Sequence, residues 1–215
     1  MTLLTTPAHA VTVTFGFWDQ SQGGLPYAIE TTGDGTHTLS NFYLGNNWGG
    51  VASWVSDPNA GGGGFYELAI NDVFNTLPDT ARFYATFQGI TTPSPQLTIP
   101  TFFQSSSIQP GEVFVEQAYI CPIGSALFCD DYFPGSNGTP FGSQMWTSTG
   151  TIPTTLSATA PGSPYDITLV IHVASSLCTS VALRCTDYVD MASAVGVQPF
   201  RSRPPAPSPV LAFRV

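Results

Sequence analysis

Lysine is absent from this chain, and charge of either sign is scarce. Charged residues make up 9% of the 215 residues, against about 25% in an average soluble protein. Five arginines face fourteen carboxylates, which gives a formal net charge of −9 at pH 7. A chain with this charge repels phosphate backbones and anionic lipid surfaces, so we expect no nucleic-acid partner.

Long helices and long apolar runs are also missing. The 21 glycines and 19 prolines interrupt the chain repeatedly, and helices of about ten or more residues form poorly in such a chain. No apolar run approaches the roughly 18 residues of a membrane-spanning helix, so we expect no membrane span. Hydrophobic residues nevertheless make up 42% of the chain, enough to bury a sizeable core.

The chain is rich in short segments whose apolar residues alternate with other residues. Every second residue from Tyr165 to Val173 is apolar, which puts five such side chains on one face of a strand. This strand would span roughly 27–30 Å, so we expect it at the centre of the fold. The segment Phe65–Leu77 fits neither a strand nor a helix well. Other strand-like segments are Val11–Trp18, Tyr27–Thr31, His37–Leu44, Val51–Val55, Arg82–Phe87, Gln96–Phe103, Glu112–Cys121, Met145–Leu156 and Asp187–Val197.

These strands and the turns between them predict an all-β fold, an antiparallel β-sandwich or jelly-roll-like architecture with little helix. Residues 11–200 would form a single sandwich domain. Residues 1–10 end in Ala8-His9-Ala10, a small-x-small pattern that indicates either a signal-peptide remnant or a flexible tail. Residues 201–215 would form a proline-rich C-terminal tail.

The four cysteines fall into two close pairs, Cys121 with Cys129 and Cys178 with Cys185. We expect disulfides, although the sequence allows three connectivities. Free buried thiols and zinc are the alternatives; zinc is disfavoured because there is no Cys-x-x-Cys and the three histidines are scattered. Disulfides indicate an oxidising compartment and hence a secreted, extracellular protein.

No constellation of residues has the spacing of a known catalytic set. The chain has no Gly-x-Ser-x-Gly nucleophile motif. Glu112 and Glu116 would lie roughly 13 Å apart along a strand, too far for a retaining glycosidase, and are expected to face solvent. His172 is isolated within its strand and is expected to be structural. A protein without catalysis is the preferred interpretation, with a β-sandwich hydrolase of scattered residues as a further alternative.

Two groups of residues are candidates for binding. Trp48 and Trp54, with Asn46 and Asn47, could form a platform on which the apolar face of a sugar ring stacks, or the tryptophans could pack in the core. Asp130 and Asp131 could hold a calcium ion with backbone carbonyls, or could be solvated loop carboxylates. Calcium is therefore the one candidate cofactor.

A segment near the C-terminus resembles one that recurs in secreted bacterial proteins of the PEP-CTERM, exosortase-sorted class. It runs Gly162-Ser163-Pro164-Tyr165-Asp166-Ile167-Thr168 and leads into the alternating strand, and Pro204-Pro205-Ala206-Pro207 stands where that class has Pro-Glu-Pro. The glutamate is absent and no membrane helix follows. The resemblance implies an exported surface or matrix protein of Gram-negative bacteria, with no catalytic residues to carry over.

The sequence as a whole predicts a secreted structural or adhesive protein of the extracellular matrix or cell surface. The alternative is a carbohydrate-binding module, stabilised by calcium. The expected partners are accordingly further copies of the chain or an extracellular glycan.

Overall fold

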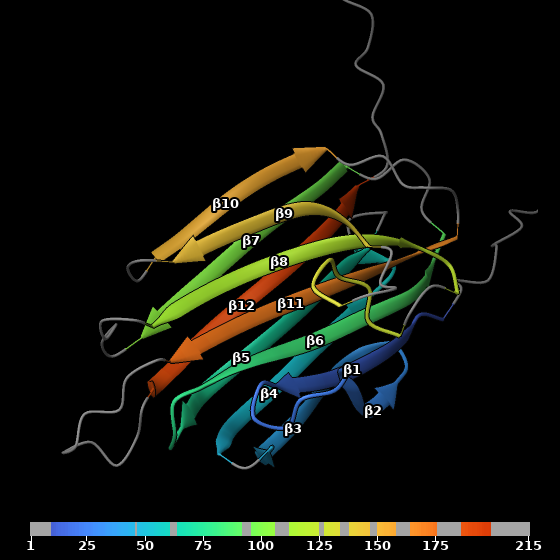
Figure 1. The fold of residues 1–215 in the computed structure, drawn as a ribbon. Coiled ribbons are helices and arrows are strands. Elements are labelled where there is room, and N and C mark those ends of the chain that lie inside the picture. The colour runs from blue at the N-terminus through green and yellow to red at the C-terminus, as the bar shows by residue number, and fades with distance from the viewer. Residues whose placement is uncertain are drawn as a thin grey trace, which may run out of the picture.

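The computed structural model describes residues 10–45, 47–60, 64–91, 96–105, 112–124, 127–133, 138–146, 150–157, 164–175 and 186–198. In these ranges the chain forms twelve strands in two six-stranded antiparallel sheets (Figure 1). Sheet A has the order β2 (Tyr27–Thr32), β1 (Thr12–Asp19), β6 (Asp79–Ile90), β11 (Tyr165–Ser175), β8 (Val113–Pro122) and β9 (Thr139–Trp146). Sheet B has the order β10 (Gly150–Ser157), β7 (Gln96–Ser105), β12 (Thr186–Gln198), β5 (Phe65–Asn75), β4 (Trp48–Asp57) and β3 (Gly35–Leu44).

The two sheets lie face to face as an antiparallel β-sandwich, which confirms the predicted fold class (Figure 1). Contacts across the sandwich join β11 to β12 and β5 to β6. β11 lies between β6 and β8 in sheet A, so the alternating strand is central, as expected. Among the described residues, no helix is long and apolar enough to cross a membrane.

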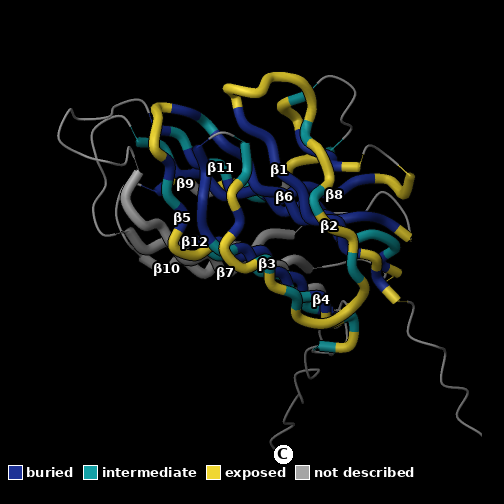
Figure 2. The backbone as a smooth tube through the Cα atoms, turned by 90° about the horizontal axis from the view of Figure 1, so that it is seen from below, coloured by how far each residue is buried: buried dark blue, intermediate teal, exposed yellow. Residues whose placement is uncertain are grey.

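Large side chains fill the space between the sheets, and Figure 2 marks the buried stretches of the strands in dark blue. Ile167, Leu169 and Ile171 of β11 point into it, and all three are fully buried. The ambiguous segment Phe65–Leu77 contributes β5, a strand, because its buried side chains meet this core from sheet B. The glycines and asparagines of Asn46–Gly50 favour a loop in the sequence, yet β4 begins at Trp48, whose side chain fills the core.

The expectation for Glu116 was wrong. It shares the inward face of β8 with Phe114 and Ala118, both of which belong to the core between the sheets. Glu116 is buried rather than facing solvent, because side chains two residues apart on a strand point the same way. The outward face of β8 carries Val115 and Tyr119 instead.

The described residues 123–124 and 127–133, here called the covering loop, follow β8 and lie on the outer face of sheet A. A second apolar cluster forms beneath this loop; it comprises Trp18, Tyr84, Tyr119, Cys121, Phe128, Cys129 and Val170. A disulfide joins Cys121 to Cys129, with a Cα–Cα distance of 6.3 Å, which selects one of the pairings that the sequence leaves open for these two cysteines. Closing so short a loop stabilises the folded state by about 2–3 kcal/mol in the chain-entropy account.

Several expectations lie outside the described residues. These are the leader or flexible tail at residues 1–9, the proline-rich tail, and the second cysteine pair, Cys178 with Cys185. They stay predictions.

Candidate functional site

One row of side chains crosses the outer face of sheet A from β1 to β9. Strand register places Trp18 beside Arg82, Arg82 beside His172, and His172 beside Val115. Met145 of β9 continues the row and is exposed at the sheet edge. With strands about 4.8 Å apart, the row is roughly 19 Å long.

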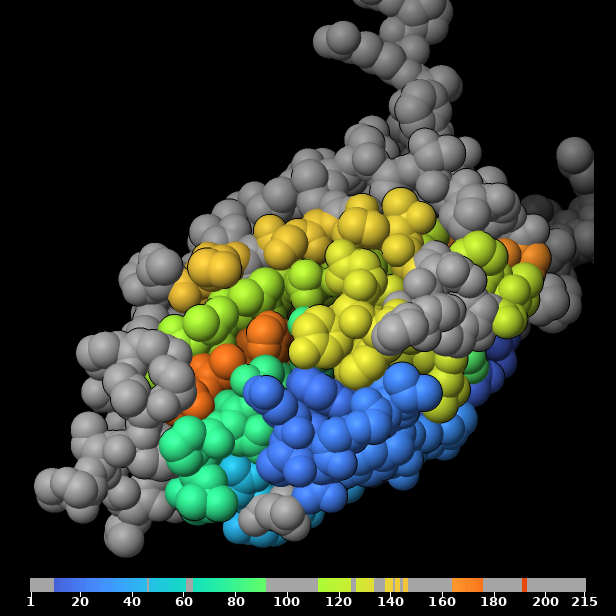
Figure 3. Space-filling model, viewed as in Figure 1, coloured from blue at the N-terminus to red at the C-terminus, as the bar shows by residue number. Residues whose placement is uncertain are grey.

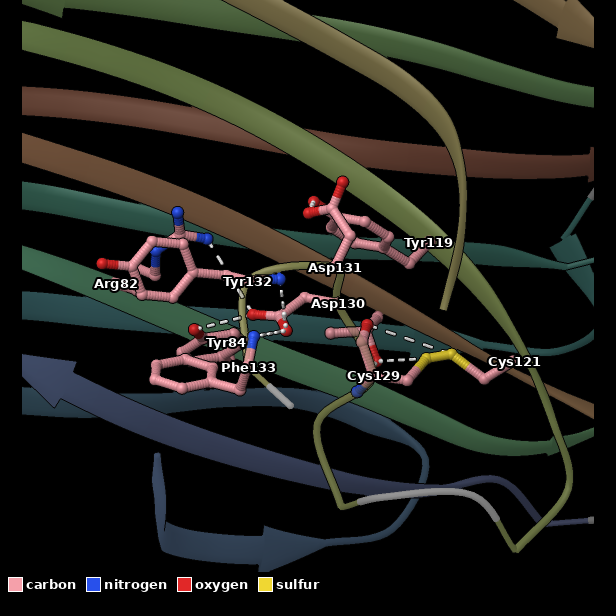
Figure 4. Close-up of polar contacts among 10 residues, drawn as sticks. Arg82, Tyr84, Tyr119, Cys121, Cys129, Asp130, Asp131, Tyr132 and Phe133 are labelled. Atoms are coloured by element: carbon pink, nitrogen blue, oxygen red, sulfur yellow. Dashed lines mark hydrogen bonds and ion pairs between the residues drawn. A yellow bond between two sulfur atoms is a disulfide. The ribbon is translucent and has the colours of Figure 1, made fainter. Parts of the chain in front are cut away.

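The end of the covering loop places the ring of Tyr132 against Arg82, a residue of this row (Figure 4). The guanidinium carbon of Arg82 lies 3.8 Å from the centroid of the Tyr132 ring. The rings of Trp18 and Phe133 pack edge-on to Tyr132, at centroid distances of 5.5 Å and 4.8 Å. Tyr132 is nevertheless 51% exposed. We call these four residues (Trp18, Arg82, Tyr132 and Phe133) the aromatic patch.

The patch is fixed from below by the buried carboxylate of Asp130 (Figure 4). Its Oδ1 accepts hydrogen bonds from the backbone N–H groups of Tyr132 and Phe133, at 3.2 and 3.4 Å. Its Oδ2 accepts one from the Tyr84 hydroxyl at 3.0 Å and lies 3.9 Å from Nη1 of Arg82. Burial and the charge of Asp130 raise the pKa of Tyr84, so its hydroxyl remains a donor. One carboxylate thereby fixes both the loop and the arginine under the Tyr132 ring.

The structure separates the roles of the two adjacent aspartates. Asp130 is buried, so the solvated-loop interpretation is wrong for this residue. Asp131 is exposed, and its Oδ1 accepts a 2.7 Å hydrogen bond from the hydroxyl of Tyr119. Within the described residues, no three His, Cys, Asp or Glu side chains group as metal ligands. Calcium binding by Asp130 and Asp131 stays a prediction.

His172 lies at the middle of the row, half-buried between Arg82 on β6 and Val115 on β8. Burial, together with the positive charge of Arg82, lowers the pKa of His172 to about 4. The imidazole is therefore neutral at pH 7, so His172, Val115 and Met145 add no charge to the row there. Figure 3 shows atoms of β11, in orange, at the surface beside the yellow atoms of the covering loop.

The predicted tryptophan platform is not at the surface. Trp48 and Trp54 are both fully buried between the sheets. Trp54 stacks on Phe15 with the rings 4° from parallel, and its Nε1 donates to Thr32 at 2.9 Å. These two indoles are core residues that present no face to a sugar, because both occupy inward positions of β4. The core alternative was the correct one.

The two asparagines predicted to join those tryptophans, Asn46 and Asn47, form no surface site among the described residues. Asn47 is buried, and its Nδ2 donates to the backbone carbonyl of Leu77 at 3.3 Å. Asn46 lies outside the described residues. The exposed ring of Tyr132 packs on Arg82, which is itself buried, and the two residues are fifty positions apart in the sequence. The one signal in the sequence is the alternation of Val11–Trp18, which puts Trp18 on the face opposite Phe15 and Phe17.

No protein-family model matches the chain, and no curated protein matches it. Among solved structures, it is similar to a carbohydrate-binding module that recognises mannan, with a TM-score of 0.33 and 8% identity over 84% of this chain and 86% of that one. It is also similar to carbohydrate-binding modules of the β-sandwich superfamily with promiscuous specificity, with a TM-score of 0.34 and 15% identity over 88% and 84%.

Proposed function

We propose that this protein is a non-catalytic carbohydrate-binding module whose site is the aromatic patch and the adjoining row of sheet A. The observation that carries this proposal is the half-exposed Tyr132 ring held on the Arg82 guanidinium. A cation against one face of an aromatic ring contributes about 0.5–2 kcal/mol. Together with Asp130 it holds the ring in one orientation before any ligand arrives, which lowers the entropic cost of binding.

The chemistry of the patch suits a neutral sugar. The negative face of an aromatic ring attracts the weakly positive C–H groups on the apolar face of a pyranose. A nucleic-acid base could also stack on such a ring, but a net charge of −9 opposes a phosphate backbone. Beyond Tyr132, the half-buried His172 and the exposed Met145 are the side chains of the row that further sugar units would contact. The structural or adhesive interpretation stays a prediction that no described contact favours.

An extracellular location follows as part of the same proposal. The disulfide between Cys121 and Cys129 supports it, because such bonds persist in oxidising compartments. The disulfide also anchors the covering loop at Cys129, three residues before Tyr132. The extracellular location and the aromatic patch both favour an extracellular glycan as the partner.

The test compares glycan binding by the wild type and two tyrosine variants. The wild type is applied to a glycan array, and the best ligand is then titrated calorimetrically. Tyr132→Ala should weaken binding by tenfold or more, since stacking contributes about 1–3 kcal/mol per ring in comparable platforms. Tyr43→Ala is the matched control: Tyr43 is 63% exposed but lies on β3 of the other sheet.

Tyr43→Ala should bind as the wild type does, and both variants should keep the wild-type circular dichroism. Equal losses in the two variants, or no binding to any glycan by the wild type, would overturn the proposal.

A further inference from the structure

Four buried polar side chains gather at one end of the sandwich. In the strand register this is the end opposite the disulfide between Cys121 and Cys129. Asp19 ends β1 and pairs with Ala81, so Asp79, two residues before Ala81, lies on the same inward face of sheet A. From sheet B, Asn75 ends β5, and Asn47 directly precedes β4. All four are buried. We call this group of four residues the polar end.

Direct contacts hold the polar end together across the two sheets. The side-chain amides of Asn47 and Asn75 both donate to the carbonyl of Leu77, at 3.3 and 2.6 Å. Nε1 of Trp48, which pairs with Asn75, donates to Oδ2 of Asp79 at 3.3 Å. These contacts bring both asparagines and Asp79 around the start of β4.

Asp19 reaches the same place through Gly45. A Cβ atom on Gly45 would overlap Oδ2 of Asp19, so the Gly45 backbone lies directly against this carboxylate. Gly45 has a φ of 59°, a left-handed conformation that glycine adopts without strain. Gly45 stands two residues before Asn47, so the Asp19 carboxylate lies against the backbone close to Asn47 in the chain.

Three oxygen atoms of this group are buried and accept no hydrogen bond: Oδ2 of Asp19, Oδ1 of Asn47 and Oδ1 of Asn75. The other polar atoms of the same side chains are engaged. Oδ1 of Asp19, for example, accepts from the Ser21 hydroxyl and the Gln22 backbone, both at 2.7 Å. The orphaned atoms are acceptors only, and leaving such atoms buried without a partner is costly.

The polar end also carries uncompensated negative charge. Asp19 and Asp79 are two buried carboxylates, yet the ion pair found among the described residues, Arg82 with Asp130, lies on the outer face of sheet A. Bound water would satisfy the orphaned oxygens but would leave this charge in place. A hard divalent cation would satisfy both, and calcium accepts carboxylate and amide oxygens in flexible geometry.

We propose that the polar end binds a calcium ion through Asp19, Asn47 and Asn75, with Asp79 completing the negative charge of the site. The ion would join β1 and β6 of one sheet to β4 and β5 of the other. This site is distinct from Asp130, whose two carboxylate oxygens accept hydrogen bonds from protein donors, and from Asp131, whose Oδ1 accepts one.

The experiment measures thermal unfolding of the full chain after chelation and after return of calcium or, as a control, the same concentration of magnesium. Calcium should raise the melting temperature by several degrees, and magnesium should not. Asp19→Asn should abolish most of this shift and weaken calcium affinity by more than about tenfold, because ligand charge sets calcium affinity. Asp131→Asn, at the other candidate pair, is the matched control and should keep the full shift.

Two further measurements test the calcium site in case Asp19→Asn fails to fold. Asn47→Ala removes a neutral ligand and should reduce the calcium shift while leaving both carboxylates in place. Terbium bound to the wild type should show luminescence excited through Trp48, and calcium should compete it away. No calcium shift in the wild type would overturn the proposal, as would a shift lost in Asp131→Asn but kept in Asp19→Asn and Asn47→Ala.

Discussion

Tyr132 owes its place at the surface to residues that are themselves buried. Its backbone N–H is held by Asp130, and its ring lies over Arg82, which sits in turn beside that carboxylate. The sequence identifies Asp130 as a candidate binding residue but gives no sign that it contacts Tyr132 and Arg82. Their contact depends on how the covering loop lies over β6, and no local pattern encodes that placement. By contrast, the alternation of Val11–Trp18 suffices to put Trp18 on the face opposite Phe15 and Phe17.

His172 should make the protein less stable in mild acid. Its pKa falls from 6.5 in the unfolded chain to about 4 in the folded one. The unfolded state therefore binds the proton first as the pH falls. The stabilisation is complete above pH ~6.5 and is lost between pH ~6.5 and ~4, at most about 3 kcal/mol.

Denaturant unfolding of the wild type and of His172→Gln, from pH 7.5 to 4.5, measures this contribution. The pKa values of Glu67 and Asp166 are raised by burial, which acts in the opposite direction, so the difference between the two proteins isolates His172. The variant should lose less stability over this range. Parallel pH profiles for the two proteins would contradict the assignment.

At the scale of elements, the segments predicted as strands contribute to strands of the structure. Strands with one buried face carry alternating apolar residues, and this pattern is visible in the sequence. The predictions differ from the structure where packing in the core, rather than the local residue pattern, decides the secondary structure. Glycines around Trp48 indicated a loop, yet β4 begins there because the indole fills the core. Phe65–Leu77 was ambiguous because β5 carries a register shift opposite β4 and a positive φ at Asp72, which interrupt its alternation.

The covering loop is seated on sheet A through a glycine. A Cβ atom on Gly16 of β1 would overlap the ring of Phe128, so this ring packs directly on the strand backbone. Gly16→Ala should force the ring out of place and destabilise the protein by about 1–3 kcal/mol. Urea unfolding measures the change.

The matched control is Gly33→Ala, since nothing lies within 4 Å of a Cβ atom at Gly33. Gly33→Ala should leave stability unchanged or slightly raised. If Gly16→Ala were equally harmless, the packing of the covering loop on β1 would not be as described.

For the whole molecule, composition and strand pattern were sufficient to predict an antiparallel sandwich, but not the order of its strands. Sheet A places β6 between β1 and β11, strands far apart in the chain, and such pairings depend on contacts that local sequence does not record. The aromatic patch depends on this order, since its residues come from β1, β6 and the covering loop. A binding face assembled in this way is visible only once the sheet is complete.

Glycan binding at the aromatic patch can be followed by NMR through the indole N–H signals of the tryptophans. Trp18 belongs to the patch, whereas Trp48 and Trp54 are buried between the sheets. Titration of the ¹⁵N-labelled protein with the best array ligand should shift the Trp18 indole signal and leave those of Trp48 and Trp54 in place. A shift of Trp48 or Trp54 without one of Trp18 would contradict the account.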